Sequence, residues 1–145
     1  MTRKFIISSA LAALVSLAAA APASANDVFL EQWGLWNQAG GGQVGTGNVI
    51  GVYQNGIING AVANQDGNGN LSAIGQQGIN NYGETYQHGD SNAAGVGQFG
   101  TNHNSILSQD GNGNVAAGVQ VGNGCNAGVA QTGAGNVAAF VQACP

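Results

Sequence analysis

Side-chain amides provide the main chemistry that the residue spacing of this chain can support. Glutamine occurs at every eleventh position from Gln32 to Gln142, and only two other glutamines exist. Glycine follows each of these glutamines after two positions, until Cys144 takes the last place. Asparagine follows after five positions, with His103 and Cys125 as the exceptions. An amide both donates and accepts hydrogen bonds, so the strict period predicts that copies of one short unit meet each other in a regular array.

Other residues that could do chemistry are few. His88 falls in an expected turn and His103 takes an asparagine position, so the period implies no nucleophile or carboxylate partner for either histidine. The Asp-Gly-Asn-Gly-Asn segments at 66–70 and 110–114 resemble the start of a calcium loop, but neither has the closing glutamate. We therefore interpret them as glycine-rich turns, and we expect no enzyme activity, metal or cofactor.

The first 25 residues are typical of a secretory signal peptide. Arg3 and Lys4 precede an apolar run, and an A-x-A cleavage site ends at Ala25. The expected domains are a signal peptide over residues 1–25, an N-terminal segment with a degenerate first half-repeat over 26–42, and a repeat array over 32–143.

The composition after the signal peptide excludes several partners. Both of the Lys and Arg residues lie in the signal peptide, whereas all six acidic residues follow it. A surface without cations cannot neutralise phosphates, so nucleic acid and anionic lipid are not expected partners. No membrane span is expected once the signal is removed.

Cys125 and Cys144 are the only cysteines. Export would place them in a compartment where a disulfide can form, and such a bond would tie down the C-terminal edge of the array. A pair of unlinked thiols is the alternative that the sequence leaves open.

An eleven-residue period fits either three helical turns or a strand and a turn. A glycine in every unit costs about 1 kcal/mol per copy in a helix, so composition favours strands. We place the turn on the four residues after each glutamine and a seven-residue strand from asparagine to the next glutamine. Alternation then puts the asparagine, the positions two and four residues after it and the glutamine on one face. Those two intermediate positions are mostly small or apolar, so this face is expected to point inward.

Two strands and two turns give a coil of 22 residues, and the array holds five: 32–53, 54–75, 76–97, 98–119 and 120–141. The predicted fold is all-β, a two-sheet β-solenoid with a cross-β arrangement. Identical amides then stack into ladders, which would satisfy buried polar groups and fix the register. The expected assembly ladder consists of Gln43, Gln54, Gln65, Gln76, Gln87, Gln98, Gln109, Gln120, Gln131 and Gln142 together with Asn48, Asn59, Asn70, Asn81, Asn92, Asn114 and Asn136.

Such a stack exposes strand edges at both ends. Natural sheets block their edges with charge or proline, but no lysine or internal proline does so here. Head-to-tail addition of further copies would satisfy both edges without closing a ring, which predicts an open fibre.

The motif Gln-x-Gly-x-x-Asn-x-Ala-x-x-x-Gln, as in 54–65 and 109–120, resembles the curlin repeat. The resemblance extends over about residues 32–143 and implies a secreted subunit of an extracellular functional amyloid that serves adhesion and biofilm formation. It also implies a nucleator subunit and an outer-membrane secretion channel as partners, and a secretion-recognition role for residues 26–42. Nucleating subunits of the family that it resembles tend to carry basic residues, and no Lys or Arg follows residue 25 here, so the resemblance favours the major subunit. Alternatives are a nucleating or accessory surface subunit, or a monomeric β-solenoid that binds a carbohydrate surface.

Overall fold

The computed structural model describes residues 26–145 and contains eleven strands, with no helix in that range. The expected signal peptide, residues 1–25, lies outside the described residues. Six strands form one sheet: β1 (Asp27–Leu35), β3 (Val49–Ile57), β5 (Leu71–Ile79), β7 (Ala93–Thr101), β9 (Val115–Asn123) and β11 (Val137–Cys144). Five form the other: β2 (Gln38–Val44), β4 (Gly60–Asp66), β6 (Tyr82–His88), β8 (Asn104–Asp110) and β10 (Asn126–Thr132).

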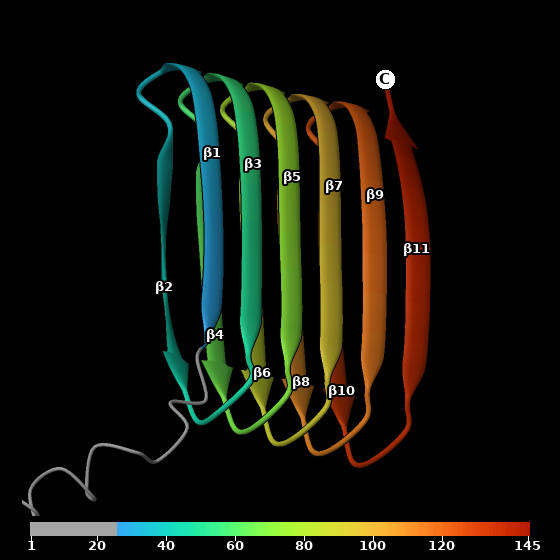
Figure 1. Cartoon of the computed structure of the whole chain (residues 1–145). Coiled ribbons are helices and arrows are strands. Elements are labelled where there is room, and N and C mark those ends of the chain that lie inside the picture. Colours follow the sequence, from blue (N-terminus) through green and yellow to red (C-terminus); the bar gives the residue numbers. More distant parts are fainter. Residues whose placement is uncertain (1–25) are drawn as a thin grey trace, which may run out of the picture.

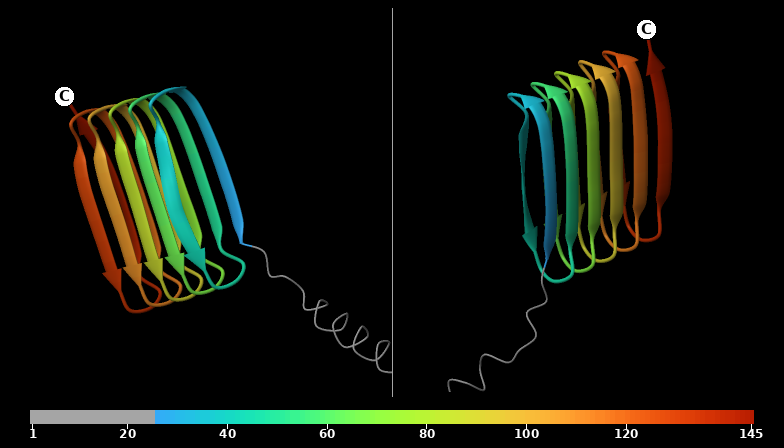
Figure 2. Two further views of the ribbon diagram at one scale, coloured as in Figure 1. Left: turned by 90° about the vertical axis from the view of Figure 1, so that its left-hand side faces the viewer. Right: turned by 45° about the horizontal axis from the view of Figure 1, so that its top comes forward.

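The chain alternates between these two sheets, and successive strands of each sheet stack in sequence order (Figure 1). Every strand pair is parallel and in register with a shift of 22 residues; Gln54, for example, lies beside Gln76. The views in Figure 2 show the two sheets face to face, with β1 and β2 at one end of the stack and β11 at the other. The predicted two-sheet β-solenoid is confirmed.

The N-terminal strand was not expected from the sequence. Residues 27–35 form β1, which pairs with β3 from Asp27 beside Val49 to Leu35 beside Ile57. The segment before the first predicted strand therefore belongs to the solenoid, because Gln32 keeps the register of the glutamine column beside Gln54.

The two sheets differ in strand length, contrary to the uniform seven-residue strand that we predicted. Strands of the five-stranded sheet have seven residues and end one residue after the glutamine, as in β4. Strands such as β3 in the six-stranded sheet have nine and continue to the third residue after it. The longer strands form because Gly56 and Ile57 remain in register with Gly78 and Ile79, which keeps the ladder intact into the corner.

Glycine is required in the corners. From Gln32 to Gln131, the glycine two residues after each ladder glutamine has a positive φ, as at Gly56 with φ 143°. A Cβ on Gly56 would lie 1.8 Å from the carbonyl oxygen of Gly78 in the next coil. Only glycine allows the backbones of neighbouring coils to approach this closely.

The core is thin and lies between the sheets. Its apolar part consists of Ile50, Val52, Ala61, Ala63, Ile74, Val96, Leu107 and Ala116, all of which are buried. These residues occupy the two positions between asparagine and glutamine, as the alternation predicted. The outward residues between them, such as Tyr53 and Tyr86, are exposed.

Candidate self-assembly site

Each interior glutamine forms hydrogen bonds in three directions. The Nε2 of Gln76 donates to the carbonyl oxygen of Gly60 at 2.8 Å and to Oε1 of Gln98 at 2.8 Å. Its Oε1 accepts from Nε2 of Gln54 at 2.7 Å. Gln76 is 1% exposed, so these bonds satisfy an amide that has no access to water.

Two continuous glutamine ladders run along the stack, one in each sheet. In both, every Nε2 donates to the Oε1 of the glutamine 22 residues later, so the ladders have a direction. The six-stranded sheet holds Gln32, Gln54, Gln76, Gln98, Gln120 and Gln142. The five-stranded sheet holds Gln43, Gln65, Gln87, Gln109 and Gln131. The structure thus brings together all the glutamines singled out from the sequence, and their role in assembly stays a prediction.

The asparagines link neighbouring coils at the corners. The backbone N–H of Asn70 donates to Oδ1 of Asn48 at 2.9 Å, and Nδ2 of Asn70 donates to the carbonyl oxygen of Gly89 at 2.7 Å. The same backbone N–H donates to Oδ1 of the asparagine 22 residues earlier at Asn59, Asn81, Asn92, Asn114 and Asn136. Asn26 begins one column by accepting from the backbone of Asn48, a contact that the sequence reasoning missed. The 22-residue spacing between them was the available signal.

His103 takes over both functions of the asparagine that it replaces. Its Nδ1 accepts from the backbone N–H of Cys125 at 3.2 Å, and its Nε2 lies 3.2 Å from the carbonyl oxygen of Phe99. An imidazole with its proton on Nε2 satisfies both contacts, as an amide oxygen and nitrogen do elsewhere in the column. His103 is 1% exposed and is therefore a structural residue of the corner.

Cys125 and Cys144 are joined by a disulfide with a Cα–Cα distance of 5.6 Å. Cys144 lies beside Gly122 in the last strand pair, and Cys125 occupies the asparagine position of the neighbouring corner. The bond attaches the end of β11 to the corner between β9 and β10.

His88 does have a carboxylate partner, contrary to the expectation from the period. Its Nδ1 lies 3.0 Å from Oδ1 of Asp110, and the two exposed side chains are the last residues of β6 and β8. The hydrogen bond to Asp110, together with the charges of Asp110 and Asp66, raises the pKa of His88 above 6.5. Register explains the miss, because residues 22 apart in sequence lie side by side and Asp66, His88 and Asp110 form one column.

The two segments that resemble calcium loops are turns whose polar side chains bond to the next coil. Asn68 donates to Oδ1 of Asp90 through its backbone at 2.7 Å and its side chain at 3.1 Å, and Asp90 donates through its backbone to Asn112 at 2.7 Å. Residues 26–145 contain no group of three or more His, Cys, Asp or Glu side chains that could hold a metal ion.

The two ends of the stack are unlike its middle. At the N-terminal end, Val28 and Leu30 occupy inward positions yet are 54% and 55% exposed. They line a hollow of about 210 Å³, to which β2 contributes Gly40, Gly41, Gly42 and Gln43. The strands β1 and β2 form the sheet edges at this end, and β10 and β11 form them at the other.

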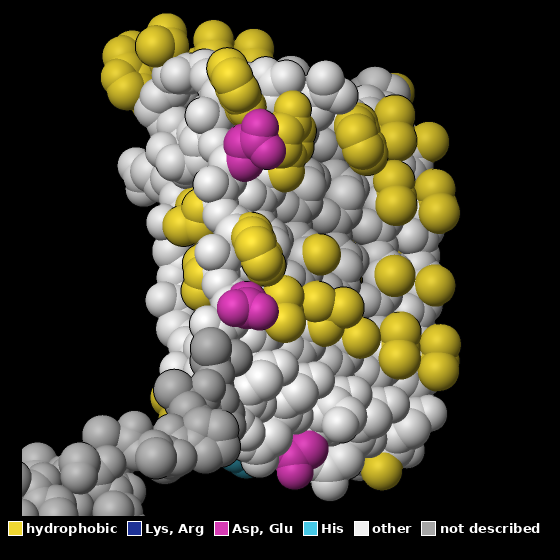
Figure 3. Space-filling model, viewed as in Figure 1, with side chains coloured by type: hydrophobic (Ala, Val, Ile, Leu, Met, Phe, Trp, Pro, Cys, Tyr) yellow, Lys and Arg dark blue, Asp and Glu magenta, His cyan; other side chains and the backbone are white. Residues whose placement is uncertain are grey.

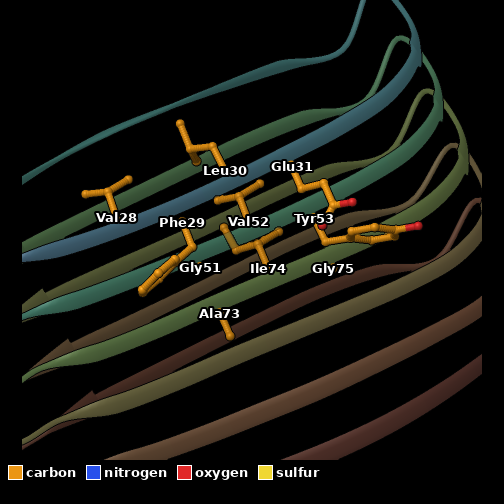
Figure 4. Close-up of a pocket in the computed structure, with 10 residues that line it drawn as sticks. All are labelled: Val28, Phe29, Leu30, Glu31, Gly51, Val52, Tyr53, Ala73, Ile74 and Gly75. Atoms are coloured by element: carbon orange, nitrogen blue, oxygen red, sulfur yellow. The ribbon is translucent and has the colours of Figure 1, made fainter.

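The outer face of the six-stranded sheet carries a shallow apolar groove beside β1. Phe29, Tyr53 and Ala73 line it from outside, whereas Val28 and Val52 point to the other side of the strands (Figure 4). Figure 3 shows further hydrophobic side chains across this face, with a few acidic groups and no basic ones. Phe29 is 65% exposed and Tyr53 is 44% exposed.

Three further findings concern membrane-spanning helices and known proteins. None of the described residues forms a helix that could cross a membrane. Residues 78–111 match the family model of the curlin associated repeat. Comparison with curated proteins gives no match.

Proposed function

We propose that this chain, of which residues 78–111 match the curlin associated repeat, is a structural subunit of an extracellular curli-type amyloid fibre. The subunit adds head to tail to further copies of itself and has no enzymatic role. The fibre serves adhesion and biofilm formation, and its subunits reach the cell surface by export. A nucleator subunit and an outer-membrane secretion channel are the partners proposed from the family.

The open ends of the glutamine ladders are the observation that carries this proposal. Inside the stack, both hydrogens of each Nε2 are used, as in Gln98, which donates to Tyr82 and to Gln120. At the C-terminal end, the Nε2 of Gln131 and that of Gln142 each donate only to a backbone carbonyl among the described residues. Each therefore keeps one N–H that another copy of the chain can accept.

The strand edges favour the same conclusion. Parallel, in-register strands with identical amide columns are the arrangement that a cross-β fibre extends indefinitely. The edge strands contain no lysine, arginine or proline, the residues that commonly prevent edge-to-edge addition. Acidic groups are sparse on these edges, so charge repulsion opposes assembly only weakly.

A carbohydrate-binding solenoid is the second candidate, and the groove beside β1 is the observation in its favour. Exposed Phe29 and Tyr53 could stack on sugar rings, and Glu31 could accept hydrogen bonds from sugar hydroxyls. The groove is mainly apolar and lies on a flat sheet face, which fits lateral contact between fibres equally well.

Purified protein from which any aggregate has been removed tests the proposal directly. We expect thioflavin fluorescence to rise after a lag, and the product to give a 4.7–4.8 Å meridional reflection. Protein that remains monomeric and gives no such reflection would refute the fibre proposal, and binding of monomer to polysaccharide would then support the second candidate.

Substitution of Gln54 or Asn114 by leucine should slow assembly, because each change interrupts a ladder. Unchanged kinetics would count against the ladders as the basis of assembly. A nucleating or accessory subunit would behave differently in a mixture. Added at a low molar ratio to another curlin-repeat protein, it would accelerate fibre formation by that protein and contribute little to the mass of the fibres.

A further inference from the structure

The two sheets do not end at the same level along the stack, because one contains six of the described strands and the other contains five. We propose that successive copies in the fibre are related by a half turn about its axis. In this arrangement, β1 of the incoming copy extends the five-stranded sheet beside β10, and its β2 extends the six-stranded sheet beside β11. The inference rests on the proposed fibre function and specifies the contact between copies.

The half turn is compatible with the structure because the glutamines of both sheets make the same hydrogen bonds. Gln54 in the six-stranded sheet donates to the carbonyl oxygen of Gln38, and Gln65 in the five-stranded sheet donates to that of Val49; in each case the acceptor lies 16 residues earlier. Both ladders also share the step of 22 residues between glutamines. A strand can therefore move from one sheet to the other and find the same hydrogen-bond partners.

Joining without rotation would leave a strand position empty. The chain alternates between sheets, so the position that follows β11 lies in the five-stranded sheet, next to β10. If β1 of the next copy were placed on β11 instead, its β2 would lie two strand spacings, about 9.6 Å, from β10. Backbone hydrogen bonds cannot cross that distance, and one edge would stay unpaired at every junction.

The side chains at the junction fit the rotated register. With glutamines aligned, Phe140 of one copy lies beside Gly41 of the next. Inside the chain the ring of Phe140 already requires a glycine neighbour, because a Cβ on Gly118 would be 2.0 Å from its Cζ. Gly41 lines the hollow of about 210 Å³ and provides a second neighbour without a side chain. Without rotation, the strand that meets Phe140 is β1, and the facing residue is Leu30.

The ladders also continue across this junction. Gln131 and Gln142 offer their remaining Nε2 hydrogens at the C-terminal end. Among the described residues, the Oε1 atoms of Gln32 and Gln43 accept no hydrogen bond, although both glutamines donate to the next coil. The half turn aligns Gln131 with Gln32 and Gln142 with Gln43, so both ladders pass from copy to copy in the same direction.

The rotated contact also covers apolar surface that a single copy leaves open. Val28 and Leu30 point inward but are more than half exposed, at 54% and 55%. In the rotated register they meet Ala127 and Val129 of β10, which occupy the equivalent inward positions of the five-stranded sheet. Burial of these side chains adds a hydrophobic contribution to the hydrogen bonds of the strands.

Cysteine pairs at outward positions distinguish the two registers. The half turn places Glu31 of one copy beside Ala130 of the next, whereas joining without rotation places it beside Val141. Neighbouring strands in register are about 4.8 Å apart, which is within the Cα distance that a disulfide spans. We would prepare fibres of the variants Glu31→Cys/Ala130→Cys and Glu31→Cys/Val141→Cys, with Glu31→Cys alone as the control, and oxidise them mildly.

We expect the Ala130→Cys pair to give a series of covalent multimers on a non-reducing gel, and the Val141→Cys pair to match the single variant. Multimers from the Val141→Cys pair alone, or from neither pair in well-formed fibres, would overturn the half turn and leave the fibre proposal intact. Failure of the unsubstituted protein to form fibres would instead refute the proposed function.

Electron microscopy of the fibre provides a second readout that needs no substitution. Five and a half coils give an axial rise of about 26 Å per copy, together with a half turn added to the twist of the coils. Joining without rotation gives six coil spacings, or about 29 Å, with no half turn. A helical reconstruction that finds the second set of values would overturn the inference.

Discussion

Replacement of Gln76 by leucine tests whether the buried ladder stabilises the fold. Gln76 lies in the middle of the stack and its side chain is 1% exposed. Leucine has a comparable size but no polar atoms. The change would leave two groups without partners: one N–H of Gln54 and Oε1 of Gln98. The carbonyl oxygen of Gly60 would lose the Gln76 amide but keep its backbone bond to β6, with which Gly60 pairs in parallel register.

The structure allows the magnitude to be worked out. Each buried polar group left without a partner costs about 1–3 kcal/mol, so two of them cost about 2–6 kcal/mol. Burial of a leucine side chain returns about 2 kcal/mol. The expected net loss is therefore about 0–4 kcal/mol, with a central value of about 2 kcal/mol.

Denaturant unfolding of freshly prepared monomer, followed by circular dichroism, would measure this loss. Gln77→Leu is the matched control, since Gln77 is the next residue along β5 and is exposed on the outer face. We expect that variant to change the free energy of unfolding by less than about 0.5 kcal/mol. Equal effects of the two substitutions would refute the claim that the ladder, rather than general features of the strand, stabilises the fold.

Three further predictions follow from the corners and the ends. Gly56→Ala should cost about 3 kcal/mol or more in a thermal or denaturant melt, because its Cβ has no space, whereas Gly95→Ala should cost little because its Cβ meets nothing within 4 Å; similar losses would contradict the steric argument. Reduction of the disulfide between Cys125 and Cys144, which are separated by 19 residues, should lower the free energy of unfolding by about 3 kcal/mol and speed hydrogen exchange at the backbone amides of β11. Unchanged protection of these amides from exchange would show that β11 is held by its strand pairing alone. Because the pKa of His88 is raised, the ion pair with Asp110 contributes fully to the free energy of unfolding below pH 6.5, and this contribution is lost as pH rises through the raised pKa. The melting temperature of the protein should therefore exceed that of His88→Asn by more at about pH 5.5 than at about pH 8.5. A difference in melting temperature that does not depend on pH would exclude the ion pair.

The period and the alternation made most of the repeating fold predictable. A residue type that returns every eleven positions must occupy equivalent sites, and alternation along a strand decides which side chains share a face. The inward positions of asparagine and glutamine, the glycine corners with positive φ and the 22-residue coil could all be read from residues such as Gln54, Gly56 and Asn59. Each of these properties is local or follows directly from repetition.

What could not be predicted depends on contacts between coils. The strand Asp27–Leu35 was missed although Asn26, Gln32 and Gly34 keep the spacing of the repeat, because no glutamine lies eleven positions before Gln32 to begin that unit. Its pairing with β3 shows it to be a strand. The carboxylate partner of His88 was missed because Asp110 is remote in sequence and becomes a neighbour only through the register. The hydrogen bonds of His103 likewise need the next coil, which supplies the N–H of Cys125.

The sequence by itself thus determined the repeating unit, its inward face and the amide columns, because these depend on the period and on the geometry of a single strand. The tertiary structure decided how far each strand extends into its corner and how the two sheets end. It also decided that a glycine-lined hollow at one end faces outward, while Phe140 lies at the other. These properties arise from stacking, in which the space and the hydrogen-bond partners of each residue are provided by residues 22 positions away.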